Sequence, residues 1–252
     1  MPADMQLLVE KLREMKDMYE NAIKNGEYTS LIRSKKLINI LHEYVIEELK
    51  RRIEQSWIVT DKKIYGFPKV KEQDIVIKPP EDDANNVSVG PLMVINVRSQ
   101  LSSIEKNYDT MFERLFAEAL NIHNRFPYTV LGYIYLLPKV GYDPEAAKER
   151  RVELSERYNL EKYIFSFSSV ANRRNPHDAP WRYERMCLLI VDFEKETPEV
   201  MESMSTFLNE GIVSEQFARF YTFKHLSIRG FFDDLHKLMV ERYYLLFSRS
   251  QR

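Results

Sequence analysis

Apolar side chains recur at helical spacing near both ends of the chain. Near the start they are Met5, Leu8, Leu12, Met15, Met18, Tyr19 and Ile23, and the stop signal Asn25-Gly26 follows them. This spacing predicts a helix over 4–24. A similar pattern predicts a second helix over 34–55 with Ser34 as its cap, and further helices over 104–125, 144–158, 199–210 and 230–247.

Between these segments the pattern changes to short apolar runs. Residues 73–78 are predicted to form a strand that Pro79-Pro80 stops, followed by a polar turn over 81–86. The run 91–97 is almost entirely apolar, which is typical of a strand covered on both faces. Strands are also predicted over 129–137, 162–167 and 186–193. This order of elements predicts an α/β (α+β) fold, in which a mixed central β-sheet is flanked by helices.

Composition narrows the class of protein. The chain has 252 residues, 44% of them hydrophobic, which is enough to bury a substantial core in a single domain over 1–252. Its charges nearly cancel at a formal net charge of -1, so any DNA-binding face must be local. The single Cys187 excludes an intrachain disulfide and a thiolate metal cluster. We expect a cytoplasmic protein with no membrane partner, because no apolar run approaches the roughly 18 residues of a membrane span.

A polar cluster follows the predicted strand 91–97, just before a helix begins. It contains Arg98, Ser99, Gln100, Ser102 and Ser103, and Lys106 follows. The exit of a buried strand is where α/β proteins usually assemble sites for anions and metals. The chain has no Walker or dinucleotide glycine pattern and no pair of histidines at zinc spacing. Nucleotide hydrolysis and redox catalysis are therefore disfavoured.

The layout of this region resembles the PD-(D/E)XK nucleases, and in particular type II restriction endonucleases. The resemblance rests on a long helix with acidic residues, a strand that carries Asp74, and a strand that ends in Asn96-Val97-Arg98 before a helix. In that family this last strand carries Asp or Glu, any residue, then Lys. The resemblance implies a restriction-endonuclease-like core over 34–138 and a helical appendage over 1–30. The rest of the sheet, a recognition loop and further helices would occupy 139–252.

The resemblance also implies a set of site residues. Asp74 would bind Mg²⁺ with Glu47 or Glu43 of the preceding helix, and Asn96 would complete the metal shell. The catalytic residues would be Asp74, Asn96, Arg98, Gln100 and Glu47. Glu113, Arg114 and Glu118 on the following helix either line the same cleft or form ordinary ion pairs on the helix surface.

Two positions depart from the family pattern. Asn96 adds no charge, and Arg98 can clamp a phosphate but stays protonated, so it cannot act as a general base. Two mechanisms are compatible with these departures. In the first, Arg98 stabilises the phosphate and a metal-bound water attacks without help from a lysine. In the second, a lysine at another position, Lys71, Lys78 or Lys106, takes the role of the catalytic lysine. We favour the first mechanism, because Arg98 occupies the lysine position itself.

Groups suited to DNA contact extend beyond this cluster into a basic loop over 172–183. The predicted nucleic-acid-binding residues are Arg98, Ser99, Gln100, Ser102, Ser103, Lys106, Arg173, Arg174, Asn175, His177 and Arg182. The expected function is a sequence-specific, Mg²⁺-dependent double-stranded DNA endonuclease of a restriction-modification system. We expect a homodimer, because palindromic sites mirror two-fold symmetry. The alternatives are a catalytically inactive DNA-binding protein on the same fold and a helical interaction protein without affinity for nucleic acid.

Overall fold

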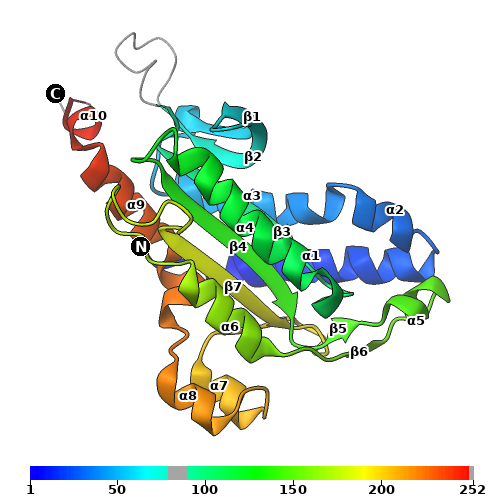
Figure 1. Cartoon of the computed structure of the whole chain (residues 1–252). Coiled ribbons are helices and arrows are strands. Elements are labelled where there is room, and N and C mark those ends of the chain that lie inside the picture. The colour runs from blue at the N-terminus through cyan, green and yellow to red at the C-terminus, as the bar shows by residue number, and fades with distance from the viewer. Residues whose placement is uncertain (79–89, 250–252) are drawn as a thin grey trace.

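A mixed six-stranded sheet runs through the centre of the protein (Figure 1). The computed structural model describes residues 1–78 and 90–249, so the predicted Pro79-Pro80 stop and the turn over 81–86 lie outside the described residues. The strands, in their order across the sheet, are β1 (Ile58–Tyr65), β2 (Val70–Ile77), β3 (Met93–Ser99), β4 (Val130–Pro138), β7 (Arg185–Asp192) and β8 (Glu199–Met201). The pairs β3–β4 and β4–β7 are parallel and the other neighbours are antiparallel, which confirms the predicted mixed sheet.

Helices cover both faces of this sheet, as predicted. One face packs against α1 (Met5–Lys24), α3 (Lys36–Lys50) and α9 (Phe231–Arg242), and the other packs against α4 (Tyr108–His123) and α6 (Leu160–Ser169). Successive strand residues point to opposite faces, so Ile95 joins the first core and Val94 joins the second. Within the described ranges, none of the helices has the length and apolar character that crossing a membrane requires.

Shorter elements connect these layers. They are α2 (Tyr28–Arg33), α5 (Pro144–Lys148), α7 (Met204–Asn209), α8 (Glu215–Phe220) and α10 (Tyr244–Arg249), with a small sheet of β5 (Gly141–Tyr142) and β6 (Leu154–Glu156). Single 3₁₀ turns occupy Gln55–Trp57, Glu105–Asn107, Lys224–Leu226 and Ile228–Gly230.

The helix predicted over 4–24 is confirmed, because Asp4 caps α1 by accepting a hydrogen bond from the Leu7 backbone at 3.0 Å. The cap predicted for the next helix is wrong. Ser34 ends α2 instead, and α3 begins at Lys36 without a side-chain cap. The helix predicted over 34–55 is accordingly shorter and finishes at Lys50.

The strand predicted over 162–167 is also wrong, since this segment belongs to α6. Asn159 caps the helix by accepting a hydrogen bond from the Lys162 backbone at 3.2 Å. Tyr163, Ile164 and Phe167 are buried on one side, which is helical spacing. The segments 144–158 and 199–210 are only partly helical, because each also contains a short strand, β6 or β8.

Candidate functional site

The strands β2 and β3 stop pairing where the candidate residues begin. Their ladder ends at the pair Ile75–Ile95. Beyond that pair, the Asp74 backbone donates a hydrogen bond to Asn96 Oδ1 at 3.1 Å, and the Val97 backbone donates one to Asp74 Oδ2 at 2.8 Å. Side chains thus replace the missing ladder bonds. The buried Asp74 and Asn96 are thereby held at fixed positions at the end of the sheet ladder.

The Asn96 amide joins these strands to α4. Its Nδ2 donates to Gln73 Oε1 at 2.8 Å and to Glu118 Oε2 at 3.2 Å. The other Glu118 oxygen accepts a hydrogen bond from the Lys71 ammonium group. Glu118 is only 5% exposed, so it belongs to the inner side of α4 rather than to a solvated face. One amide therefore lies between the two acidic residues Asp74 and Glu118, with Lys71 beside the second.

Arg98 supplies a cation on the other side of Asp74. Its Nη1 lies 2.6 Å from Asp74 Oδ2 and 2.7 Å from the Val97 carbonyl oxygen. Burial disfavours the charged guanidinium, but Asp74, together with Tyr133 and Glu118, more than offsets that effect, so the pKa of Arg98 is raised above its ordinary value. Asp74 Oδ2 and the Val97 carbonyl oxygen thus both accept from the Arg98 guanidinium at the end of β3.

His42 of α3 approaches the same carboxylate from the opposite side of the sheet. Its Nε2 lies 3.8 Å from Asp74 Oδ2 and has no hydrogen-bond partner among the described residues. Burial lowers the pKa of His42, and the nearby Asp74 carboxylate only partly opposes this. The imidazole is therefore neutral near pH 7 and adds no further positive charge.

A pocket of about 490 Å³ opens beside this cluster, and we call it the basic pocket. Its lining includes Lys69, Lys71, Arg98 and Arg114, against the single acidic side chain of Glu118. Neither Lys69 nor Arg114 forms an ion pair with an acidic residue in the described part of the chain. Ser99, Gln100, Asn107 and Thr110 add hydrogen-bonding groups to the wall. This excess of positive charge and of donors suits a phosphate group.

The helix acids predicted to bind metal do not join Asp74. Glu43 pairs with Lys11 at 2.5 Å and Glu47 pairs with Lys50 at 2.7 Å, on the exposed side of α3. His42 and the apolar core residues occupy the inner side of the same helix. The predicted roles of Glu43 and Glu47 are therefore wrong. For Glu118 the sequence left open either a position in the cleft or a surface ion pair, and the structure places it beside Asn96 at the basic pocket.

The predicted polar cluster is only partly available to a ligand. Ser99 and Gln100 line the basic pocket, although Gln100 Nε2 also donates to the Ser102 carbonyl. Ser102 is buried and its hydroxyl bonds to Tyr28 at 2.8 Å, so a direct phosphate contact by Ser102 is wrong. Ser103 is partly exposed and Lys106 is exposed, and neither lines the basic pocket.

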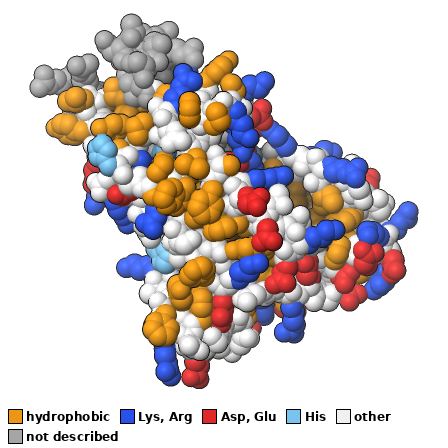
Figure 2. All heavy atoms as spheres, in the orientation of Figure 1, with side chains coloured by type: hydrophobic (Ala, Val, Ile, Leu, Met, Phe, Trp, Pro, Cys, Tyr) orange, Lys and Arg blue, Asp and Glu red, His pale blue; other side chains and the backbone are white. Residues whose placement is uncertain are grey.

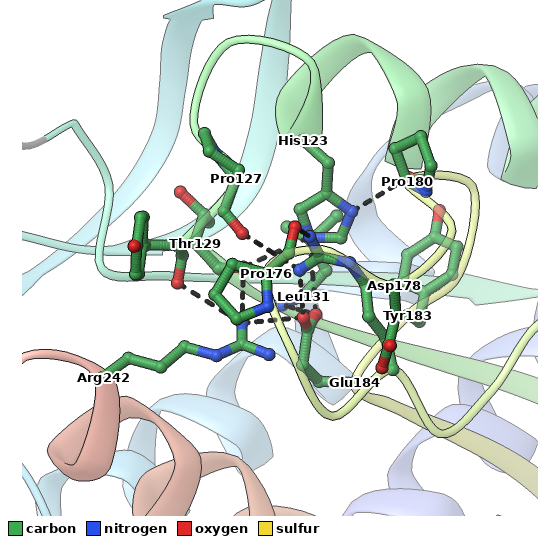
Figure 3. A network of polar contacts seen from close by, with 12 residues as sticks. His123, Pro127, Thr129, Leu131, Pro176, Asp178, Pro180, Tyr183, Glu184 and Arg242 are labelled. Atoms are coloured by element: carbon green, nitrogen blue, oxygen red, sulfur yellow. Dashed lines mark hydrogen bonds and ion pairs between the residues drawn. The ribbon is translucent and has the colours of Figure 1, made fainter.

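The basic loop over 172–183 is anchored by a buried ionic network that its sequence did not reveal (Figure 3). Glu184 is fully buried and accepts hydrogen bonds from Arg173 and Arg242, each at 2.7 Å. Burial alone would raise the pKa of Glu184, but the hydrogen bond with His123 and the Arg242 charge lower it. His123 also bonds to the Pro180 carbonyl at 2.9 Å, which ties the loop to the end of α4.

This network changes the interpretation of the loop. Arg173 is only 1% exposed, so its predicted role in binding nucleic acid is wrong. Arg174, Asn175, His177 and Arg182 are exposed, and their contact with DNA stays a prediction. The Asp178 carboxylate accepts hydrogen bonds from the Arg174 and Asn175 backbones at 2.9 Å, which fixes the turn that presents these side chains.

The donors around Asn96 fit a magnesium ion better than a transition metal. Mg²⁺ prefers oxygen ligands and is usually held by one or two carboxylates together with substrate phosphate. Glu118 lines the basic pocket and Asp74 does not, and each carboxylate is paired with a cation, Lys71 for Glu118 and Arg98 for Asp74. Among the described residues, no group of three or more His, Cys, Asp or Glu side chains is arranged to hold a metal.

Comparison with known proteins adds no family to this picture. No protein-family model matches the chain, and no curated protein and no solved structure matches it at a significant level.

Proposed function

We propose that the chain is a Mg²⁺-dependent double-stranded DNA endonuclease of the type II restriction kind that acts at the basic pocket. The observation that carries this proposal is the Asn96 amide, which accepts a hydrogen bond from the Asp74 backbone and donates one to Glu118, the partner of Lys71. Glu118 offers the carboxylate that position 96 lacks, and Lys71 offers the lysine that position 98 lacks. This favours the mechanism in which a lysine at another position is catalytic over the mechanism that relies on Arg98 alone.

Each residue would have a distinct role in phosphodiester hydrolysis. Mg²⁺, when bound, would supply charge neutralisation at the phosphate and a water of lowered pKa. Asp74 and Glu118 would hold the ion, and the Asn96 amide would keep the Glu118 carboxylate and the Asp74 backbone in place. Lys71 would orient the attacking water. Arg98 would leave Asp74 and grip the phosphate in the basic pocket, where a planar guanidinium can bind bidentately.

A second candidate function is DNA binding without cleavage on the same scaffold. It is favoured by one specific observation, that both carboxylates already have a cationic partner, Arg98 for Asp74 and Lys71 for Glu118. A site with such internal ion pairs could bind phosphate through the remaining positive charge of Lys69 and Arg114. It would show salt-sensitive binding and no metal-dependent cutting.

Incubation of the purified protein with mixed-sequence duplex DNA separates the two candidates. The nuclease yields discrete fragments with Mg²⁺ and none with a chelator, and the Asp74→Ala variant yields none under either condition. A DNA-binding protein without nuclease activity gives a salt-sensitive gel shift and leaves the DNA intact under all conditions. If neither cutting nor a gel shift occurs, both proposals are wrong and the interaction protein without nucleic-acid affinity is favoured.

The proposal carries two further elements. A homodimer would present two basic pockets to the two strands of a palindromic site, and a cytoplasmic location follows from a DNA substrate. Sedimentation of the protein with and without duplex DNA measures the stoichiometry, and a 1:1 complex that cuts both strands would contradict the dimer.

A further inference from the structure

The turn between β1 and β2 exposes a concentration of large apolar side chains. Tyr65 is 65% exposed, Phe67 is 62% exposed and Val70 is 47% exposed. Tyr65 and Val70 are cross-strand partners and so share one face of the hairpin. We call residues 65–70 the hairpin tip. Single exposed apolar side chains are ordinary, but three within one short turn suggest a surface made for contact.

The hairpin tip is held firmly in place by the buried Asn121 of α4. The Phe67 backbone donates to the Asn121 carbonyl at 2.7 Å, and the Lys69 backbone donates to Asn121 Oδ1 at 3.1 Å. In return, Asn121 Nδ2 donates to the Lys69 carbonyl at 3.0 Å. A Cβ on Gly66 would lie 2.4 Å from the Asn121 carbonyl oxygen, so this close approach requires glycine. The aromatic side chains are thus exposed on a preorganised turn.

Lysines flank the hairpin tip, and two of them line the basic pocket. Lys63 is exposed on β1, Lys62 is partly exposed, and Lys69 of the tip lines the basic pocket together with Lys71. Figure 2 shows basic side chains among hydrophobic ones at the end of the molecule where β1 and β2 lie. The surface therefore combines apolar groups that can stack on bases with lysines that can neutralise neighbouring phosphates.

We propose that the hairpin tip is a DNA wedge, in which Phe67 and Tyr65 insert against the bases of a duplex whose backbone enters the basic pocket. This inference rests on the proposed function, since it needs DNA in that pocket. Apolar side chains that enter a base step partly unstack it and bend the duplex, which brings more of the backbone onto the protein. The Asn121 contacts reduce the ordering cost of such an insertion, because the turn is already fixed.

The first experiment measures binding of a fluorescent mixed-sequence duplex by anisotropy in chelator, so that no cutting occurs. The double variant Tyr65→Ala with Phe67→Ala should weaken binding roughly tenfold or more, because two stacking groups are lost. The dependence on salt should keep its slope, because no phosphate contact is removed. Lys63→Gln should instead reduce that slope by about one. Phe220→Ala on α8 is the matched control, because Phe220 is 78% exposed far from the hairpin and should change neither quantity.

The second experiment places the fluorescent base 2-aminopurine along the same duplex. The wild-type protein should raise its fluorescence at one or two positions through unstacking, and the double variant should abolish the rise. If the wild type binds DNA but the double variant binds equally well, the wedge is wrong and the proposed function stands. An equal loss in Phe220→Ala would also overturn the wedge, as would tip-dependent binding to anionic lipid vesicles without a tip effect on DNA. If the wild type does not bind DNA, the proposed function itself fails.

Discussion

The position of Asn96 predicts that Asn96→Asp destabilises the protein in a way that depends on pH and metal. The Asn96 amide donates to Gln73 and to Glu118, and all three side chains are buried. A carboxylate cannot donate, so two buried acceptors lose their partner, at about 1–3 kcal/mol each. The new carboxylate would also lie beside the Glu118 carboxylate. Their repulsion raises the pKa of the new carboxyl group, and its protonation limits the loss of stability. We expect a loss of about 2–5 kcal/mol at high pH and a smaller loss in acid.

Urea unfolding followed by circular dichroism measures this change in the free energy of unfolding. The variant should regain stability at acidic pH, where the introduced carboxyl can donate a proton to a neighbouring oxygen. Added Mg²⁺ should stabilise the variant more than the wild type, since a third carboxylate then faces the ion. Asn39→Asp is the control, because Asn39 is exposed on α3, and it should change nothing. A variant as stable as the wild type at every pH would show that the amide does not join Gln73 and Glu118 as described.

Two further predictions concern the free energy of unfolding. Glu184→Ala should cost about 3–5 kcal/mol of unfolding free energy, because it leaves the buried guanidiniums of Arg173 and Arg242 without their counter-ion; an unchanged urea midpoint would contradict the network. Burial lowers the pKa of His42, His225 and His236, so below about pH 6.5 the unfolded chain binds more protons than the folded one. Stability should therefore be complete above that pH and fall as the pH drops toward the folded pKa values, and a urea midpoint that rises on acidification through this range would refute the assignment.

Much of the sheet could be predicted because its central strands are simple. The run 91–97 predicted β3 and the run 129–137 predicted β4, since a strand buried on both faces needs a continuous apolar sequence. The strand β1 was missed because it is an edge strand whose polar residues are mostly exposed. The helix α6 was mistaken for a strand because its four aromatic and β-branched residues suit either structure in a short window.

The sequence predicts which strand residues form the candidate site, but not which helix side chain they contact. Asp74, Asn96 and Arg98 meet because β2 and β3 are neighbours, and the order of apolar runs implies that pairing. Glu118 could not be assigned, because an acidic residue on a helix is usually solvated and only the packing of α4 turns it inward. Its spacing from Leu115 and Ile122 places it on the apolar side of the helix, and this signal could have distinguished it from Glu113.

A single-turnover DNA cleavage assay with Mg²⁺ that compares two acids on α4 is the sharpest test of the proposed site. Glu118 is buried beside Asn96 and Lys71, whereas Glu113 is exposed on the same helix. Glu118→Gln should lower the cleavage rate by at least about a hundredfold while DNA binding in chelator persists, and Glu113→Gln should leave the rate unchanged. Equal rates for the wild type and Glu118→Gln would contradict a site built from Asp74, Glu118 and Lys71.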